Sequence, residues 1–177
     1  DFCFADSWQI DGEGNRVGGS YIPYVDDIAP GTFRADFAMP GMDFLRRFLS
    51  IKNVILNMSG VLWRREALAQ ALDAAGPEIE NLRLASDWRL YVAACLAGQK
   101  VGYLAKALNG HRRHERGVTS SLEKRRHVDE VVQLQVLIAQ AVKLDEGTLG
   151  KAEKHLIDIR RQFGLSMRDG RGVADAR

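Results

Sequence analysis

Residue types suited to acid–base and phosphate chemistry stand in two segments of the chain. In the first, Asp87 follows Ser86 at the start of an apolar helical pattern, where the positive end of a helix dipole favours a carboxylate. A carboxylate held ionised there suits a general base, although acidic residues in a first helical turn also serve only to stabilise the helix. The second segment, residues 111–119, contains two histidines and three arginines. Imidazole can bind a divalent cation, and a guanidinium binds phosphate oxygens through its planar fork.

Hydrophobic periodicity predicts the elements that must position these residues. Strands are expected within 2–10, over 54–63 and over 100–105, and helices over 41–50, 64–75, 86–98, 122–144 and 146–163. Ser86 is expected to cap its helix, and residues 18–40 are expected to form a long ordered loop. This order predicts an α/β fold with a few short strands and a helix-rich C-terminal half.

The overall composition is that of one globular domain. The 177 residues are 46% hydrophobic and 27% charged, which suits a single folded core. A net charge of +2 is too small to indicate nucleic-acid binding. Cys3 and Cys95 each lie in an apolar stretch, which favours a reducing, cytoplasmic compartment over a disulfide framework. No apolar run is long enough to span a bilayer, and the chain opens without Met on an expected strand, so we expect further residues upstream.

A set of short patterns gives the chain a likeness to a known family. In order, the chain contains ASDWRLY at 85–91, GQKVGY at 98–103 and LNGHRRH at 108–114. With these segments it resembles the C-terminal half of family-two glycosyltransferases of the GT-A fold. In that family an acidic residue opens a helix, a glycine ends it, a short strand follows, and an Asn, an Arg and a His lie on the loop beyond. Residues 4–14 and 53–65 are similar to neighbouring parts of the family, so the likeness spans residues 2–120.

The resemblance implies a partial GT-A-like fold in three parts. Residues 1–120 would be the acceptor-side part of the catalytic domain, 121–165 a helical extension and 166–177 a disordered tail. The segment 21–27 ends in Asp26 and Asp27 and superficially resembles the aspartate motif that holds metal and sugar nucleotide in this fold. We reject that match, because a proline interrupts the would-be strand and no nucleotide-binding unit precedes it. Without a nucleotide-binding half, the chain is not expected to turn over by itself.

The same resemblance implies roles for individual residues. Asp87 would be the general base that takes the proton from an acceptor hydroxyl as it attacks the anomeric carbon of the donor sugar. Arg113 and His114 would lie on the loop that closes over the diphosphate, where His114 would ligate a divalent cation, Mn or Mg. Substrate-binding side chains are expected at Asn57, Ser59, Trp88, Arg113 and Thr119. Trp88 would stack on a sugar ring or pack in the core, and Thr119 would contact phosphate or cap the next helix.

The implied partners are a nucleotide-sugar donor and a glycan or lipid-linked acceptor, with the protein in the cytoplasm at the inner face of the membrane. The product would be a glycosidic bond in a surface polysaccharide or related glycan. One alternative is a non-catalytic module that forms homo-oligomers through the apolar stripe that begins with Val128 and ends with Ala139. Another places the basic run 112–126 on nucleic acid or an anionic membrane. Glu115 and Glu123 dilute the charge of that run, so no nucleic-acid partner is expected.

Overall fold

Strands from both halves of the chain meet in one mixed sheet. The computed structural model describes residues 1–113 and 124–166. The strands of this part are β1 (Phe2–Ile10), β2 (Arg16–Gly18), β3 (Phe37–Pro40), β4 (Val61–Trp63) and β5 (Lys100–Arg112). β1 and β5 run parallel in the centre, and the three shorter strands pair antiparallel with one or the other. The order across the sheet is β2-β1-β5-β3, with β4 also paired to β1.

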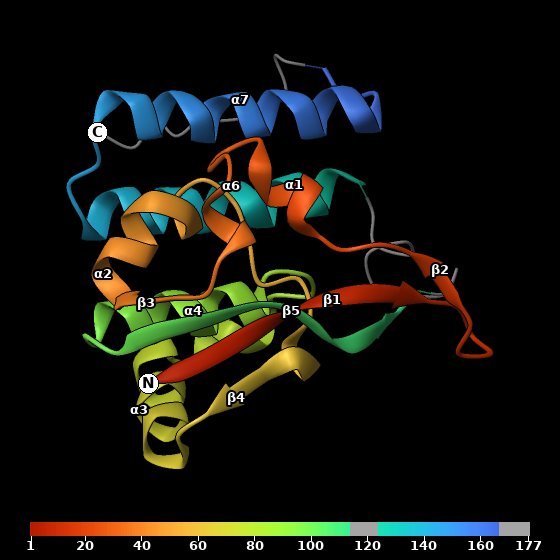
Figure 1. The fold of residues 1–177 in the computed structure, drawn as a ribbon. Helices are drawn as coiled ribbons and strands as arrows, with labels where there is room; N and C mark the ends of the chain where they lie inside the picture. The colour runs from red at the N-terminus through yellow and green to blue at the C-terminus, as the bar shows by residue number, and fades with distance from the viewer. Residues whose placement is uncertain (114–123, 167–177) are drawn as a thin grey trace.

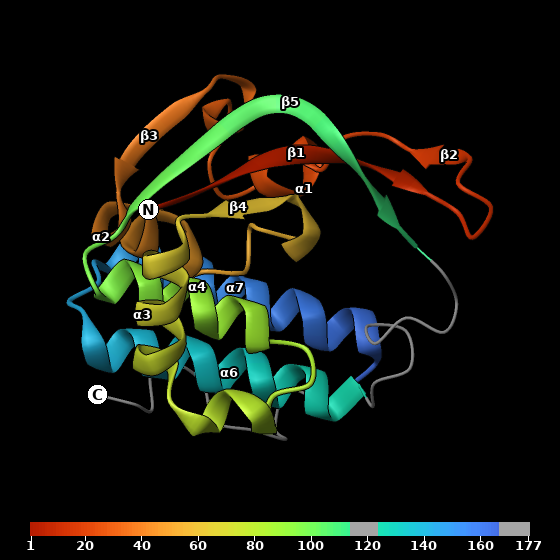
Figure 2. The same cartoon turned by 90° about the horizontal axis from the view of Figure 1, so that it is seen from below.

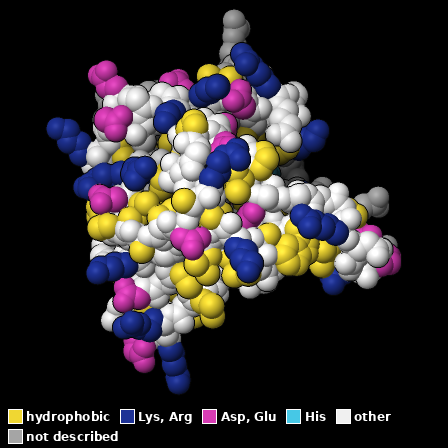
Figure 3. All heavy atoms as spheres, in the orientation of Figure 1, with side chains coloured by type: hydrophobic (Ala, Val, Ile, Leu, Met, Phe, Trp, Pro, Cys, Tyr) yellow, Lys and Arg dark blue, Asp and Glu magenta, His cyan; other side chains and the backbone are white. Residues whose placement is uncertain are grey.

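The two faces of this sheet differ in what covers them. Phe2, Phe4, Val101 and Tyr103 are buried on the face that packs on the helices. Because side chains alternate along a strand, their neighbours point to the opposite face. There Leu62 is 75% exposed, and hydrophobic side chains spread across the middle of the view in Figure 3. Lys and Arg side chains are interspersed with Asp and Glu in the same view, so this face has no continuous basic patch.

The longer helices form a layer on one side of the sheet (Figure 1, Figure 2). The α-helices are α1 (Ile22–Asp26), α2 (Gly41–Phe44), α3 (Arg65–Ala75), α4 (Ser86–Leu96), α6 (Lys124–Ala141) and α7 (Glu146–Phe163). A π-helical turn, η2 (Leu45–Leu49), continues α2, and single 3₁₀ turns are η1 (Thr32–Arg34), η3 (Met58–Gly60) and η4 (Pro77–Asn81). Among the described residues, no helix combines the length and the apolarity needed to cross a bilayer.

Helix α4 lies between the sheet and α6 (Figure 2) and is the most completely buried helix. Seven of its eleven residues are buried, which matches its apolar sequence. Helix α3 packs against α4 and buries Ala67, Ala71 and Ala75, whose small side chains allow a close approach. The buried residues of α6 and α7 belong to the same hydrophobic core as those of the sheet and α4.

The mixed α/β class and the four long helices agree with the sequence prediction, whereas the strands differ. Of the expected strand 54–63 only β4 forms, because the side chain of Asn57 accepts a hydrogen bond from the N–H of Ser59 and the backbone turns into η3. β5 continues past residue 105, because its second half pairs with residues 7–10 of β1. The expected loop 18–40 contains β3, which pairs with β5.

Ser86 does not cap α4, contrary to the sequence prediction. It is the first residue of the helix, and the capping position is occupied by Ala85, which makes no side-chain hydrogen bond there. One of the backbone N–H groups at the start of the helix has a partner in another element, because the N–H of Ala85 donates to Glu130 on α6 at 3.0 Å. The start of α4 therefore depends on a residue that is distant in sequence.

Candidate functional site

Asp87 lies at the N-terminal end of α4, the helix that packs beneath the sheet. α4 leads almost directly into the start of β5, so the N-terminus of α4 lies toward the carboxyl end of that strand (Figure 2). Asp87 is the second residue of α4. In open α/β sheets, binding crevices form outside the carboxyl ends of the parallel strands. The N-terminal end of α4, which carries Asp87, points toward that end of the strands.

The carboxylate of Asp87 is partly buried and has a raised pKa. Its Oδ1 accepts a hydrogen bond from the N–H of Trp88 at 2.6 Å and one from Nδ2 of Asn53 at 3.4 Å. Burial raises the pKa of Asp87 to about 6, and these two hydrogen bonds oppose the rise. At neutral pH the group is still mostly ionised, but it binds a proton more tightly than an ordinary aspartate. Both properties suit a general base.

A small pocket lies beside the segment that carries Asn53. Residues from β1, α1 and the turn after η2 line it: Phe4, Ala5, Asp6, Ser7, Tyr21, Ile22, Val25, Phe33, Val54, Ile55, Leu56, Asn57 and Tyr103. Asn53, which donates to Asp87, immediately precedes the lining residues Val54 to Asn57. One stretch of chain therefore borders both the candidate base and the pocket.

A chain of polar side chains crosses one wall of this pocket. Nδ2 of Asn57 donates to Oδ1 of Asn109 at 2.5 Å, and Nδ2 of Asn109 donates to Oγ of Ser7 at 2.8 Å. Gly60 lies so close to Asn109 that an added Cβ would overlap its amide. These contacts fix the rotamers of Asn57 and Asn109.

Tyr21 and His111 form a second polar pair at the same end of β1 and β5. The Tyr21 hydroxyl lies 2.7 Å from Nδ1 of His111, and the N–H of Tyr21 donates to Oδ1 of the buried Asp6 at 3.1 Å. Burial, together with the charge of Arg113, lowers the pKa of His111. A neutral imidazole at pH 7 leaves Nδ1 able to accept the hydroxyl proton.

The structure corrects one of the site residues expected from the sequence and leaves others untested. Trp88 is only 3% exposed, and its Nε1 donates to the carbonyl of Leu49 at 3.0 Å, so it belongs to the core and cannot stack on a sugar. Ser59 is exposed on η3, and Arg113 is exposed at the end of β5. His114 and Thr119 lie outside the described residues.

Sequence reasoning missed Asn53 and Tyr21 as members of the site. Asn53 was visible only as a residue that ends a helix, and Tyr21 only as part of a rejected aspartate motif. Their partners are Asp87 and His111, which are distant in sequence. The one signal in the sequence was Asn53 itself. It directly precedes the apolar run Val54 to Leu56, and an amide that becomes buried needs a hydrogen-bond partner.

The surface required by the oligomerisation alternative is partly buried within the chain. In the expected stripe of α6, Val132, Val136 and Ala139 are partly exposed and Gln135 is buried. Val128 and Val131 are each less than 5% exposed. They pack in the core that α4, α6 and α7 share. Part of the stripe from Val128 to Ala139 therefore packs within the chain, and a homo-oligomer through it stays a prediction.

The acidic residues of the described part do not assemble a metal site. Among residues 1–113 and 124–166, no group of three or more His, Cys, Asp and Glu side chains could hold a metal ion. Asp26 pairs with Arg34, and both carboxylate oxygens of Asp27 accept from the buried Lys52 at 2.6 and 2.8 Å. Both aspartates are thus paired with basic side chains of the same chain.

Comparison with protein-family profiles, with curated proteins and with solved structures finds no match for this chain.

Proposed function

We propose that this chain is the acceptor-side part of a family-two-like, GT-A-type glycosyltransferase, in which Asp87 is the general base. The observation that carries the proposal is a partly buried carboxylate with a pKa of about 6 at the N-terminus of α4, bonded to Asn53, which directly precedes residues that line a small pocket. The order of elements around it, with α4 followed by β5, is the order that the family resemblance implies.

In the proposed reaction, Asp87 accepts the proton of an acceptor hydroxyl. The O–H bond breaks as the oxygen forms a new bond to the anomeric carbon of the donor sugar, and the bond from that carbon to the nucleoside diphosphate breaks with its electron pair on the diphosphate. Asn53 holds the carboxylate on one side through its 3.4 Å contact. The donor is a nucleotide sugar, and the acceptor is a glycan or lipid-linked hydroxyl at the cytoplasmic face of a membrane.

The polar groups of the pocket support a hydroxyl-rich acceptor. Asp6, Tyr21 and Asn57 line the pocket and carry both donor and acceptor atoms, and each is held by a hydrogen bond within the chain. Buried polar groups that pair with substrate hydroxyls discriminate strongly against ligands that lack them. An Mn or Mg ion stays an expectation for the complete enzyme. No step is assigned to it, because the described residues supply no ligand set for it.

The test is the variant Asp87→Asn in the full-length protein, assayed for sugar transfer from nucleotide-sugar donors. Loss of a general base typically reduces rates by about 10²–10⁴-fold, so we expect initial rates at least about 100-fold below wild type with an unchanged circular dichroism spectrum.

The matched control is Asp43→Asn. Asp43 also stands in the first turn of a helix, α2, but it is exposed and lies outside the pocket. Its rate should stay within about twofold of wild type, as expected for a surface substitution away from the site. Normal transfer by Asp87→Asn would remove the carboxylate from the mechanism.

A further inference from the structure

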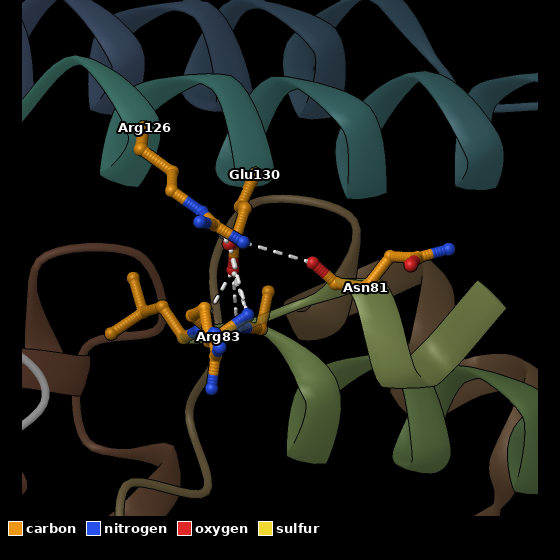
Figure 4. A network of polar contacts seen from close by, with 6 residues as sticks. Asn81, Arg83, Arg126 and Glu130 are labelled. Atoms are coloured by element: carbon orange, nitrogen blue, oxygen red, sulfur yellow. Dashed lines mark hydrogen bonds and ion pairs between the residues drawn. The ribbon is translucent and has the colours of Figure 1, made fainter. Parts of the chain in front are cut away.

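A carboxylate on α6 holds the backbone just before α4. Glu130 is 5% exposed and accepts hydrogen bonds from three consecutive backbone N–H groups (Figure 4). The N–H of Arg83 lies 2.9 and 3.1 Å from its two oxygens, that of Leu84 lies 2.7 Å from Oε2, and that of Ala85 lies 3.0 Å from Oε2. One side chain of α6 thus fixes the three residues that lead into the helix of Asp87.

Arg126 contacts both Glu130 and the loop that precedes α4. Its Nε donates to Oε1 of Glu130 at 3.2 Å, and its Nη2 donates to the carbonyl of Asn81 at 3.1 Å (Figure 4). Asn81 is the last residue of η4, which precedes the segment that Glu130 holds. Arg126 therefore ties the same loop to α6 at a second point, one helical turn before Glu130.

The cluster keeps Glu130 ionised. Burial acts to raise the pKa of Glu130, but the three backbone N–H groups and the Arg126 guanidinium outweigh it and hold the pKa below its usual value. Hydrogen bonds from backbone N–H groups to an ionised carboxylate are shorter and stronger than those between neutral groups. The hold on residues 83–85 is therefore present at every pH at which Asp87 can act as a base.

The direction of Asp87 depends on this backbone. Its carboxylate is bonded to the N–H of Trp88 at 2.6 Å, within the first turn of α4, and to Asn53 at 3.4 Å, so it follows the position of that turn. The capping position of α4, Ala85, has no side-chain hydrogen bond of its own. A shift at residues 83–85 would move the first turn of α4, and the carboxylate of Asp87 with it.

We propose that Glu130 is a positioning residue for Asp87: its carboxylate fixes the backbone of residues 83–85 and so sets the start of α4 and the aim of the base. The inference rests on the proposed transferase function. It adds that α6 helps to position the proposed base, through the bonds of Glu130 to residues 83–85.

The experiment compares Glu130→Gln with wild type in the full-length protein. Gln keeps the size of Glu but presents an amide NH₂ to backbone donors, so the hold on residues 83–85 weakens. We expect kcat to fall about 10- to 100-fold with KM within about twofold, as for an interaction that matters in the transition state. The midpoint of the kcat/KM profile near pH 6 should shift, because the surroundings of Asp87 change.

The control is Asp129→Asn, which removes the neighbouring, exposed carboxylate of α6 and should leave both readouts unchanged. If Glu130→Gln does not fold, Arg126→Gln replaces it. This variant removes the bonds from Arg126 to Glu130 and to the carbonyl of Asn81, and it leaves the three backbone N–H bonds to Glu130 in place. That variant should lower kcat by a smaller factor, about two- to fivefold, in the same direction.

A double variant separates the two proposals. If Glu130 acts through Asp87, adding Glu130→Gln to Asp87→Asn should lower the residual rate no further. An equal loss in both backgrounds, or a lowered melting temperature with kcat and pH profile unchanged, would overturn the positioning role. Normal transfer by Asp87→Asn alone would instead show that the proposed function has failed.

Discussion

At the scale of single residues, the burial that raises the pKa of the Asp87 carboxyl group also costs stability. Burial raises its pKa from the ordinary 3.8 to about 6 because the charged form loses solvation. A carboxyl group whose pKa is raised in the folded state contributes its full stability below pH 3.8, and that contribution is lost as pH rises through 6. Functional residues are often tolerated at such a cost.

This cost predicts that Asp87→Asn stabilises the protein at neutral pH. Asn is neutral at every pH, so the free energy of unfolding should rise relative to wild type above about pH 6, by at most about 3 kcal/mol for a shift of this size. Below about pH 4 the gain should vanish, because wild-type Asp87 is then neutral in both states. Urea unfolding of wild type and variant, at neutral pH and below about pH 4, measures the difference in the free energy of unfolding. A variant less stable than wild type at neutral pH would contradict the burial of a charged carboxylate.

At the scale of elements, the start of α2 packs closely against the C-terminal end of α4. Gly41 opens α2, and its N–H donates to the carbonyl of Gln99 at 2.8 Å. A Cβ at Gly41 would overlap that carbonyl and the backbone of Cys95 in α4. Since backbone atoms cannot swing aside as a side chain does, Gly41 is the residue that allows this packing.

Substitution by alanine at two glycines should change the free energy of unfolding in opposite directions. Gly41→Ala should lower the free energy of unfolding by about 1–3 kcal/mol through overpacking against α4. Gly150 lies on the exposed side of α7 with open space around it, and Gly150→Ala should raise stability by up to about 1 kcal/mol through helix propensity. Chemical denaturation reports both values. Effects of the same sign would show that the α2–α4 contact is looser than described.

Local patterns allow the helices to be predicted from the sequence, but not the long-range pairs. α3, α4, α6 and α7 follow from their apolar periodicity and from stops such as Gly76. β5 was predicted too short, because its second half exists only through pairing with β1. At the site, Asp87 and Asn57 stood out by type and position. Glu130 did not, because its partners are 45 to 47 residues away and are backbone groups.

At the scale of the whole molecule, α6 and α7 make hydrogen bonds to the backbone of the segments around the candidate site. Besides Glu130, the fully buried Gln135 of α6 donates to the carbonyl of Ile51 at 2.6 Å, close to Asn53. Lys151 of α7 donates to the carbonyl of Ile28, just after α1, at 3.0 Å. The segments before α4, after η2 and after α1 are thus each held by one hydrogen bond or more from α6 or α7.

The dependence of kcat/KM on pH for the full-length protein, with a nucleotide-sugar donor, tests the role of Asp87 most directly. This profile reports the pKa of the essential base in the free enzyme. It should rise about tenfold per pH unit at acidic pH and level off above about pH 6, where Asp87 is ionised. A profile that is flat through pH 6 in wild type, or one that Asp87→Asn reproduces at similar rates, would contradict the assignment of Asp87 as the base.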